Sequence, residues 1–312
     1  MIRLPTLPTP GVPSIEPPRA EGVAPVDGRR VLGYAEYGDP DGRLVLWFHG
    51  TPGARRQMPL VGRRAAEQLG LRLVCVERPG IGDSTDHMYA SFRDWAIDAA
   101  AVADHLGHER FAVIGLSGGG PYAMACAHEL RDRVAVTGLL GSVCPVVGPD
   151  AAPDASIVRL AARFRRVLDP LRVPLSLTVW GLMRAIMPLA HPAYQAFSGR
   201  MPEGDRAVFA DPDIEAMFIR DLNRGAQQHF GALWLDVALF GRAWGFDLAA
   251  IEGPVFWWHG DADTFVPVSH ALHCAALIPD CTLAIREGES HLGGFAAADL
   301  VLQTIDDAWS KT

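Results

Sequence analysis

A serine between two glycines is the first feature of this sequence that could do chemistry. Ser117 is the centre of a G-x-S-x-G pattern, between a predicted strand at 111–114 and a predicted helix at 121–130. A serine at the apex of so tight a turn takes a strained backbone conformation, which projects its hydroxyl above the edge of a sheet. Gly115 and Gly119 would crowd that turn if they carried side chains. The pattern in this context predicts a nucleophilic serine.

A base and an acid must accompany the serine, because its hydroxyl is a poor nucleophile at its free pKa. Two later loops supply them: Asp261 and Asp263 follow a predicted strand at 255–258, and His291 follows another at 282–285. Open α/β sheets place their sites at the carboxyl ends of the strands, where these side chains are expected. The predicted acid is Asp263, with Asp261 as the alternative, and the predicted base is His291.

Other histidines compete for the role of base among the eleven in the chain. His49 and His259 each begin a His-Gly pair directly after a predicted strand, and we expect them to brace their loops. His191 and His229 fall in a helical segment and could touch a substrate, although packing is the simpler role. No H-x-x-x-H or H-E-x-x-H spacing occurs, so no metal site is expected. No organic cofactor is expected either.

Attack by the serine creates an oxyanion that needs preorganised hydrogen-bond donors. The backbone N–H of Gly118, directly after the nucleophile, is one predicted donor. The second is expected from the loop after an earlier strand, His-Gly-Thr-Pro-Gly at 49–53. We expect the Thr51 N–H to serve, because Pro52 has no N–H and Gly53 permits the tight bend.

The elements that must position these residues alternate between strand and helix from about residue 31 to residue 140. Short apolar runs at 44–48, 71–76 and 134–140 are typical of buried strands, and apolar residues at helical spacing lie between them. Repeated β-α-β units predict a mostly parallel, twisted sheet with helices on both faces.

The rhythm changes between about residues 144 and 245, where amphipathic helices follow one another. This segment predicts an all-helical cap inserted into a core made of 28–143 and 246–312. Residues 1–27, with seven prolines in the first 25, predict an arm that is either extended and mobile or laid across the surface as a strap. Large apolar residues of the cap are candidates to line a substrate pocket: Trp180, Met183, Met187, Phe218, Phe230 and Trp234.

Composition narrows the class of protein. The chain has 312 residues, 49% apolar and 21% charged, as in a soluble globular enzyme. Its net charge of −8 disfavours nucleic-acid binding. Five cysteines without a C-x-x-C spacing favour reduced thiols and a cytoplasmic location. The longest apolar stretch, 173–190, contains Pro174, Arg184 and Pro188 and is judged too short and too interrupted for stable membrane insertion.

Together these motifs resemble the α/β-hydrolase superfamily from about residue 28 to the end of the chain. The motifs are His-Gly-Thr-Pro-Gly at 49–53, Arg-Pro-Gly-Ile-Gly-Asp-Ser at 78–84, the turn around Ser117, the Asp263 loop and Gly-Glu-Ser-His at 288–291. The resemblance implies the α/β-hydrolase fold, a Ser-Asp-His triad and a lid formed by the helical insertion. Dehalogenases and epoxide hydrolases of this fold carry an aspartate where this chain has Ser117. Proline iminopeptidases carry His-Gly-Gly-Pro-Gly, where this chain has Thr51.

The expected function is hydrolysis of a small, apolar carboxylic ester through an acyl-enzyme on Ser117. The same triad could serve carbon–carbon bond hydrolysis, thioester hydrolysis or perhydrolysis, because this fold hosts many reactions. The alternative of another class is a non-catalytic protein that binds a small ligand in the cap pocket. The oligomeric state is left open.

Overall fold

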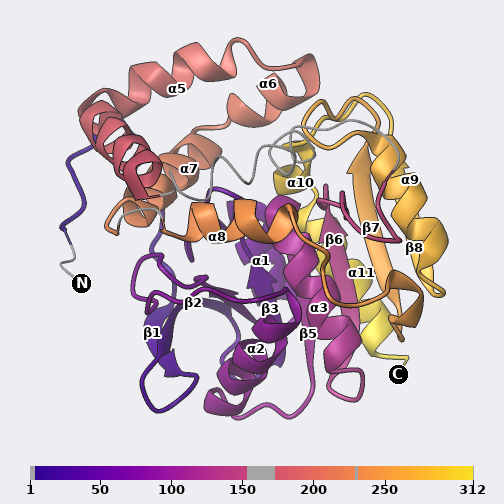
Figure 1. Ribbon diagram of the computed structural model, residues 1–312. Coiled ribbons are helices and arrows are strands. Elements are labelled where there is room, and N and C mark those ends of the chain that lie inside the picture. Colours follow the sequence, from indigo (N-terminus) through magenta and orange to yellow (C-terminus); the bar gives the residue numbers. More distant parts are fainter. Residues whose placement is uncertain (1–3, 153–172, 229–230, 312) are drawn as a thin grey trace.

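The computed structural model describes residues 4–152, 173–228 and 231–311. The described chain is built around an eight-stranded sheet in the order β1-β2-β4-β3-β5-β6-β7-β8 (Figure 1). The β1–β2 and β2–β4 pairs are antiparallel and the others are parallel, which confirms the predicted mostly parallel sheet. The strands are β1 (Ala20–Pro25), β2 (Val31–Gly38), β3 (Arg43–Phe48), β4 (Leu71–Val76), β5 (Phe111–Leu116), β6 (Val134–Leu140), β7 (Val255–Gly260) and β8 (Cys281–Arg286).

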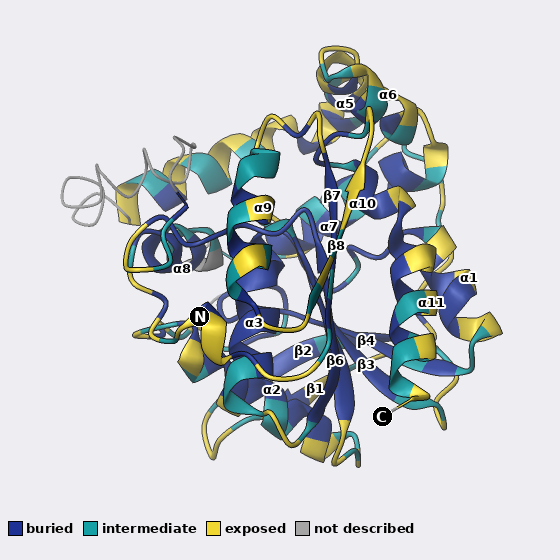
Figure 2. Cartoon of the chain, turned by 90° about the vertical axis from the view of Figure 1, so that its right-hand side faces the viewer, coloured by how far each residue is buried: buried dark blue, intermediate teal, exposed yellow. Residues whose placement is uncertain are grey.

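Helices cover both faces of the sheet, as the repeated β-α-β units predict. One face carries α2 (Arg93–His105), α3 (Gly120–Glu129) and α9 (Val268–Leu277), and the other carries α1 (Leu60–Gln68) and α11 (Ala298–Trp309). The short α10 (Gly293–Ala296) precedes α11. Figure 2 shows the inner strands buried between these layers, whereas the edge strand β8 is largely exposed. The carboxyl ends of the parallel strands are therefore the edge of the sheet at which loops can gather.

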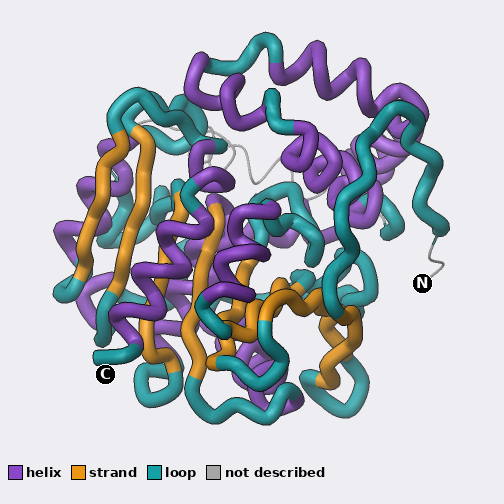
Figure 3. Tube along the Cα trace, turned by 180° about the vertical axis from the view of Figure 1, so that it is seen from behind, coloured by secondary structure: helices purple, strands orange, loops and turns teal. Residues whose placement is uncertain are grey.

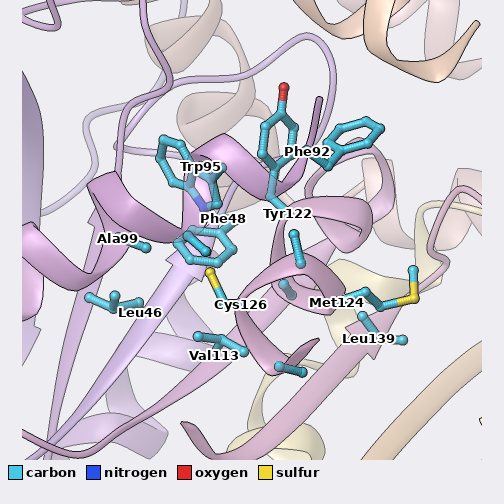
Figure 4. Close-up of a cluster of buried hydrophobic side chains, with 14 of the residues drawn as sticks. Leu46, Phe48, Phe92, Trp95, Ala99, Val113, Tyr122, Met124, Cys126 and Leu139 are labelled. Atoms are coloured by element: carbon cyan, nitrogen blue, oxygen red, sulfur yellow. The ribbon is translucent and has the colours of Figure 1, made fainter. Parts of the chain in front are cut away.

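Alternation along β3 divides the apolar core between the two layers. Leu46 and Phe48 belong to the cluster with α2 and α3, whereas Val45 and Trp47 belong to the cluster with α1 and α11. All four side chains are fully buried, as expected for a strand covered on both faces. Phe48 packs edge to face on Trp95 of α2, with 5.2 Å between the ring centroids (Figure 4).

Helices from the segment between β6 and β7 lie above the sheet, as Figure 1 shows. They are α5 (Ala190–Ser198), α6 (Glu203–Phe209), α7 (Pro212–Gly225) and α8 (Gly231–Phe240), and residues 173–186 are helical as well. Between residues 173 and 240 the described part of the predicted cap is mainly helical, whereas 144–152 and 241–245 form no helix. The proposed limits at 144 and 245 remain predictions. His229 and Phe230 lie outside the described residues.

The first helical stretch of the cap is longer than its sequence indicates. Helix runs from Val173, through the turn η2 (Met187–Leu189), to Ser198, a length of 26 residues. An 18-residue window of it has a mean hydropathy of 1.4, and 17% of that window is buried. By length and composition it could cross a membrane, which contradicts the expectation that the stretch is too short and too interrupted: helical structure continues past Pro188 through the turn η2. Helices of soluble proteins meet the same criteria, and the expected lack of membrane insertion stays a prediction.

The N-terminal arm lies as a strap against the cap. The Leu7 N–H donates to Asn223 Oδ1 at 3.1 Å, and Asn223 Nδ2 donates to the Leu7 carbonyl at 2.7 Å. Arg220 donates to the Pro13 carbonyl. Figure 3 shows the chain descending from the cap to the sheet. There β1 pairs with β2, so the sheet begins inside the range assigned to the arm.

Candidate active site

The turn after β5 has the geometry that the G-x-S-x-G pattern predicts. Ser117 has φ of 51°, the one positive φ of a non-glycine residue in the described part of the chain. A Cβ at Gly115 would lie 2.5 Å from the Gly120 Cα, and a Cβ at Gly119 would lie 2.1 Å from the Phe48 carbonyl oxygen. Both glycines are therefore required, and the strain is held at the residue whose hydroxyl faces the open edge of the sheet.

The structure brings Ser117, His291 and Asp263 together in one hydrogen-bonded chain. The Ser117 hydroxyl oxygen lies 2.8 Å from His291 Nε2, and His291 Nδ1 lies 2.7 Å from Asp263 Oδ2. The serine is half-buried, whereas the histidine and the aspartate are only 9% and 7% exposed. This arrangement can move the hydroxyl proton onto Nε2 while the carboxylate holds the tautomer and stabilises the imidazolium.

The two candidate acids are clearly separated by their contacts. Asp263 Oδ1 accepts two backbone N–H groups of its own loop, each at 2.8 Å, which leaves Oδ2 for His291. Asp261 is exposed, and its Oδ1 accepts the Gly288 N–H at 2.8 Å. Asp263, the first choice from the sequence, is thus the acid in contact with the histidine.

His49 and His259 are loop braces, as their His-Gly pairs suggest. His259 accepts the Trp257 indole N–H at 3.3 Å and donates from Nε2 to the Val266 carbonyl at 2.8 Å. His49 Nδ1 donates to the carbonyl of the next residue at 2.8 Å. Burial lowers the pKa of both histidines, and the nearby Arg78 guanidinium lowers the pKa of His49 further. Both rings are therefore neutral at pH 7 and hold loops in place.

The two residues predicted to form the oxyanion hole are in contact. A Cβ at Gly118 would lie 2.3 Å from Thr51 Oγ1, so the loop after β3 packs directly on the turn after β5. The peptide bond between Thr51 and Pro52 is cis. Both residues border a cavity together with Ser117 and His291. Thr51 and Gly118 thus lie beside the cavity in which Ser117 would attack a substrate carbonyl and an oxyanion would form.

Two cavities lined by residues that the structure describes open beside the serine, and both are bordered by Thr51, Ser117, Phe265 and His291. One has a volume of about 170 Å³ and the other about 300 Å³. The smaller is lined further mainly by Leu116, Phe197, Met201, Phe218, Leu292 and Phe295. The larger is lined further by Gly118, Val143, Leu233, Val237, Phe240 and Val266. Neither lining, within the described residues, includes an Asp, Glu, Lys or Arg side chain.

One of the described candidates for the substrate pocket lies at a cavity beside the serine. Phe218 lines the smaller cavity, but the other described candidates line neither cavity. Met187 is buried in the apolar core, Met183 packs against that core, and the Trp180 indole N–H donates to the carbonyl of residue 226. Trp234 is half-buried. An apolar stripe identifies the covered face of a helix, and in these helices much of that face covers other parts of the protein.

Several lining residues could have been found from the sequence. Leu233, Val237 and Phe240 share an apolar stripe at helical spacing with Trp234, the residue chosen instead. Phe197 and Met201 lie at the end of α5 and just beyond it, where no periodic signal marks them. His191, a possible substrate contact, instead donates from Nδ1 to Glu215 Oε1 within the cap. Across the described chain, no group of three or more His, Cys, Asp or Glu could hold a metal ion.

Comparison with known proteins bears directly on this geometry. The alpha/beta hydrolase fold family matches residues 43–295, a range that contains the strained serine, its histidine and its aspartate. The chain belongs to the alpha/beta hydrolase family. The fold that the sequence motifs imply is therefore confirmed.

Relatives of this hydrolase differ in their named activities. It is 27% identical over 273 residues to a non-heme haloperoxidase of Rhodococcus erythropolis, covering 85% of this chain and 90% of that protein. It is 32% identical over 115 residues to a proline iminopeptidase of Xanthomonas citri, covering 36% of each chain. The crystal structure of esterase RhEst1 from Rhodococcus sp. ECU1013 superposes with a TM-score of 0.63 at 23% identity, covering 93% of this chain and 98% of that one.

Proposed function

We propose that this alpha/beta hydrolase cleaves uncharged carboxylic esters through an acyl-enzyme on Ser117. The observation that carries the proposal is the hydrogen-bonded chain from Ser117 through His291 to Asp263, beside cavities whose described lining holds no Asp, Glu, Lys or Arg side chain. A serine hydroxyl needs such a base to become a nucleophile. An apolar cavity favours a neutral substrate, because a charged group there would lose its hydration without gaining a partner.

The proposed mechanism follows from the contacts. His291 Nε2 accepts the Ser117 proton as the oxygen attacks the ester carbonyl, and Asp263 stabilises the imidazolium. The N–H groups of Thr51 and Gly118 hold the developing oxyanion. His291 then protonates the leaving alcohol, which leaves the acyl group on the serine. Water, deprotonated by the same histidine, releases the carboxylic acid and restores the serine.

Covalent labelling tests the activated serine before any substrate is known. A fluorophosphonate probe should label the native chain at Ser117, and Ser117→Ala should remove the label. A panel of p-nitrophenyl esters, thioesters and vinylogous diketones then sorts the reactions that one triad can perform. Labelling with turnover of thioesters or diketones, but not of esters, would contradict the ester proposal. A native chain without labelling would point to the non-catalytic, ligand-binding alternative.

Perhydrolysis is the second candidate. The similarity to a non-heme haloperoxidase, which extends over 85% of this chain, favours it. In this reaction hydrogen peroxide replaces water as the acceptor of the acyl group, so the acyl–Ser117 bond breaks, a peracid leaves and the serine proton returns through His291. Adding hydrogen peroxide to an ester assay should then divert product from acid to peracid, which oxidises bromide. An unchanged product ratio would exclude this candidate.

The peptidase activity named for the iminopeptidase relative is not proposed. The matching segment is 36% of each chain, and Thr51 occupies a glycine position of the iminopeptidase motif. We also infer a cytoplasmic location without stable membrane insertion and without a nucleic-acid partner, from the composition and the net charge of −8. Secretion of the native chain, or its recovery in a membrane fraction, would contradict that location.

A further inference from the structure

Three helices of the cap carry buried carboxylates that contact the loops of the core. Asp205 of α6, Asp221 of α7 and Asp236 of α8 are 0%, 0% and 1% exposed. Each accepts hydrogen bonds from core residues rather than from its own helix. A carboxylate is costly to bury unless its oxygens are satisfied. These side chains therefore have a role that apolar residues at the same interface could not fill.

Asp236 is bonded to the loop that carries the predicted oxyanion donor. Its Oδ2 accepts the Thr51 hydroxyl at 2.5 Å and Arg78 Nη2 at 2.8 Å, and its Oδ1 accepts the Tyr122 hydroxyl at 2.6 Å. The same guanidinium donates to the carbonyl of His49 at 2.6 Å and to the carbonyl of the next residue at 2.8 Å. The backbone leading into Thr51 is thus held by an ion pair that α8 completes.

Asp205 is bonded to both neighbours of the histidine. Its Oδ2 accepts the Ser290 hydroxyl at 2.8 Å, and its Oδ1 accepts the Leu292 N–H at 2.9 Å. His291 lies between these two residues, so the carboxylate spans the backbone from which the imidazole projects. Ser290 is itself fully buried. Asp221, in contrast, accepts the N–H groups of Ala54 and Arg56, which lie further along the loop after β3.

We propose that Asp205 and Asp236 are positioning residues, through which the cap holds the base and the oxyanion loop in register with Ser117. The inference rests on the proposed serine chemistry. Reacting groups have to be held within about 0.5 Å of their productive geometry, and a misplacement of about 1 Å can cost roughly 100-fold in rate. The cap is thereby part of the catalytic framework as well as a cover over the substrate.

The test compares two kinds of substitution in the full-length chain: Asn variants, which keep the size of the side chain, and Ala variants, which shorten it. Asp236→Asn and Asp205→Asn each keep one acceptor oxygen but remove the charge, and Asp236→Ala and Asp205→Ala remove both oxygens. Glu215→Gln is the matched control, because Glu215 is a buried cap carboxylate whose bonds to His191 and Gln195 stay within the cap. The readouts are the inactivation rate by a fluorophosphonate, kcat and KM on p-nitrophenyl butyrate, and the melting temperature.

We expect kcat and the inactivation rate to fall together by about 10- to 100-fold in both Asn variants, while KM changes by less than about 3-fold. Each Ala variant should be slower than its Asn counterpart. Glu215→Gln should stay within about 2-fold of the native chain in both rates. Where an Asp236 variant does not fold, Thr51→Val removes the same contact from the core side and should give the same split between kcat and KM.

Two results would overturn the inference while leaving the proposed function intact. One is native inactivation rates in the Asn variants and in Thr51→Val. The other is an equal loss in Glu215→Gln, which would show that any buried cap carboxylate matters only for folding. A different result addresses the proposed function alone: a chain that is labelled at Ser117 but turns over no ester. A native chain that the fluorophosphonate does not label at Ser117 would contradict both the proposed function and the inference about Asp205 and Asp236.

Discussion

The sheet core is held mainly by apolar packing, whereas the interface between cap and core adds buried ion pairs to its apolar contacts. Around β3 the buried side chains are apolar and satisfy the strand and helix periods of their own segments. Under α7 the contacts include ion pairs: Arg224 Nε lies 2.6 Å from Glu77 Oε1 and its Nη2 lies 2.5 Å from Asp83 Oδ2. Arg55 lies 2.6 Å from the same Asp83 oxygen atom.

The difference has a physical consequence. Apolar packing tolerates small shifts, whereas buried ions and hydrogen bonds demand one arrangement, because a displaced partner leaves an unpaired charge or donor. A cap joined to the core in this way docks in one position. The core therefore supplies stability, and the cap interface supplies register to the loops that carry the chemistry.

The largest expected effect lies at the edge of the core itself. Asp263→Asn should lower kcat by about four orders of magnitude, because the amide favours the wrong tautomer of His291. Asp261→Asn should leave kcat within about 3-fold of the native value, since its carboxylate bonds to the Gly288 N–H. Steady-state kinetics on one ester measure both. A severe loss in Asp261→Asn with normal activity in Asp263→Asn would reverse the assignment.

The next effect separates core from cap in stability. Phe48→Ala should lower the free energy of unfolding by about 3–5 kcal/mol, because the ring is fully buried against Trp95. Phe218→Ala should cost clearly less, since that half-buried ring already borders a cavity. Urea unfolding followed by tryptophan fluorescence gives both values. Equal losses would show that the cap is packed as tightly as the core.

Substrate preference should respond to the cap. With apolar linings, kcat/KM should rise along p-nitrophenyl esters from acetate until a cavity is full and then fall, at roughly 0.8 kcal/mol per buried methylene. Phe218→Ala enlarges the smaller cavity and should move the optimum to longer chains if the acyl group lies there. Val237→Ala provides the same test for the larger cavity. A native profile that is flat, or that favours acetate alone, would contradict an apolar acyl site.

The smallest expected effect is a dependence of stability on pH. Burial lowers the pKa of His49 and His259. At mildly acidic pH these two side chains therefore bind protons in the unfolded chain but stay neutral in the folded chain. Their contribution to stability is complete above about pH 6.5 and declines as the pH falls below that value. Burial raises the pKa of Asp221 to about 7, so it acts with the opposite sign between about pH 7 and 4.

Unfolding free energies measured between pH 8 and pH 5.5 test this balance. The decline should be shallow in the native chain and steeper in Asp221→Asn, which removes the opposing group. His259→Gln should flatten it. An identical slope in all three proteins would mean that other groups control the stability in this range.

Local patterns did not predict β1, which lies in the range assigned to the arm. They predicted the strands β3–β8, the strained Ser117 turn and the order of serine, aspartate and histidine. Each of these depends on the period of a strand or helix, or on the space around a glycine, and both act between residues close in the chain. The family match agrees with the fold that these patterns imply.

Tertiary structure alone decided which cap residues meet the site. Periodicity shows that α8 has an apolar face, but the packing angle of the helix decides that Val237 and Phe240 line a cavity while Trp234 does not. Tertiary packing alone likewise brings Asp205 and Asp236 to the loops around the site. Their spacing resembles that of ordinary solvated acids, and their partners lie 85 or more positions away in the chain, a distance over which no local pattern extends.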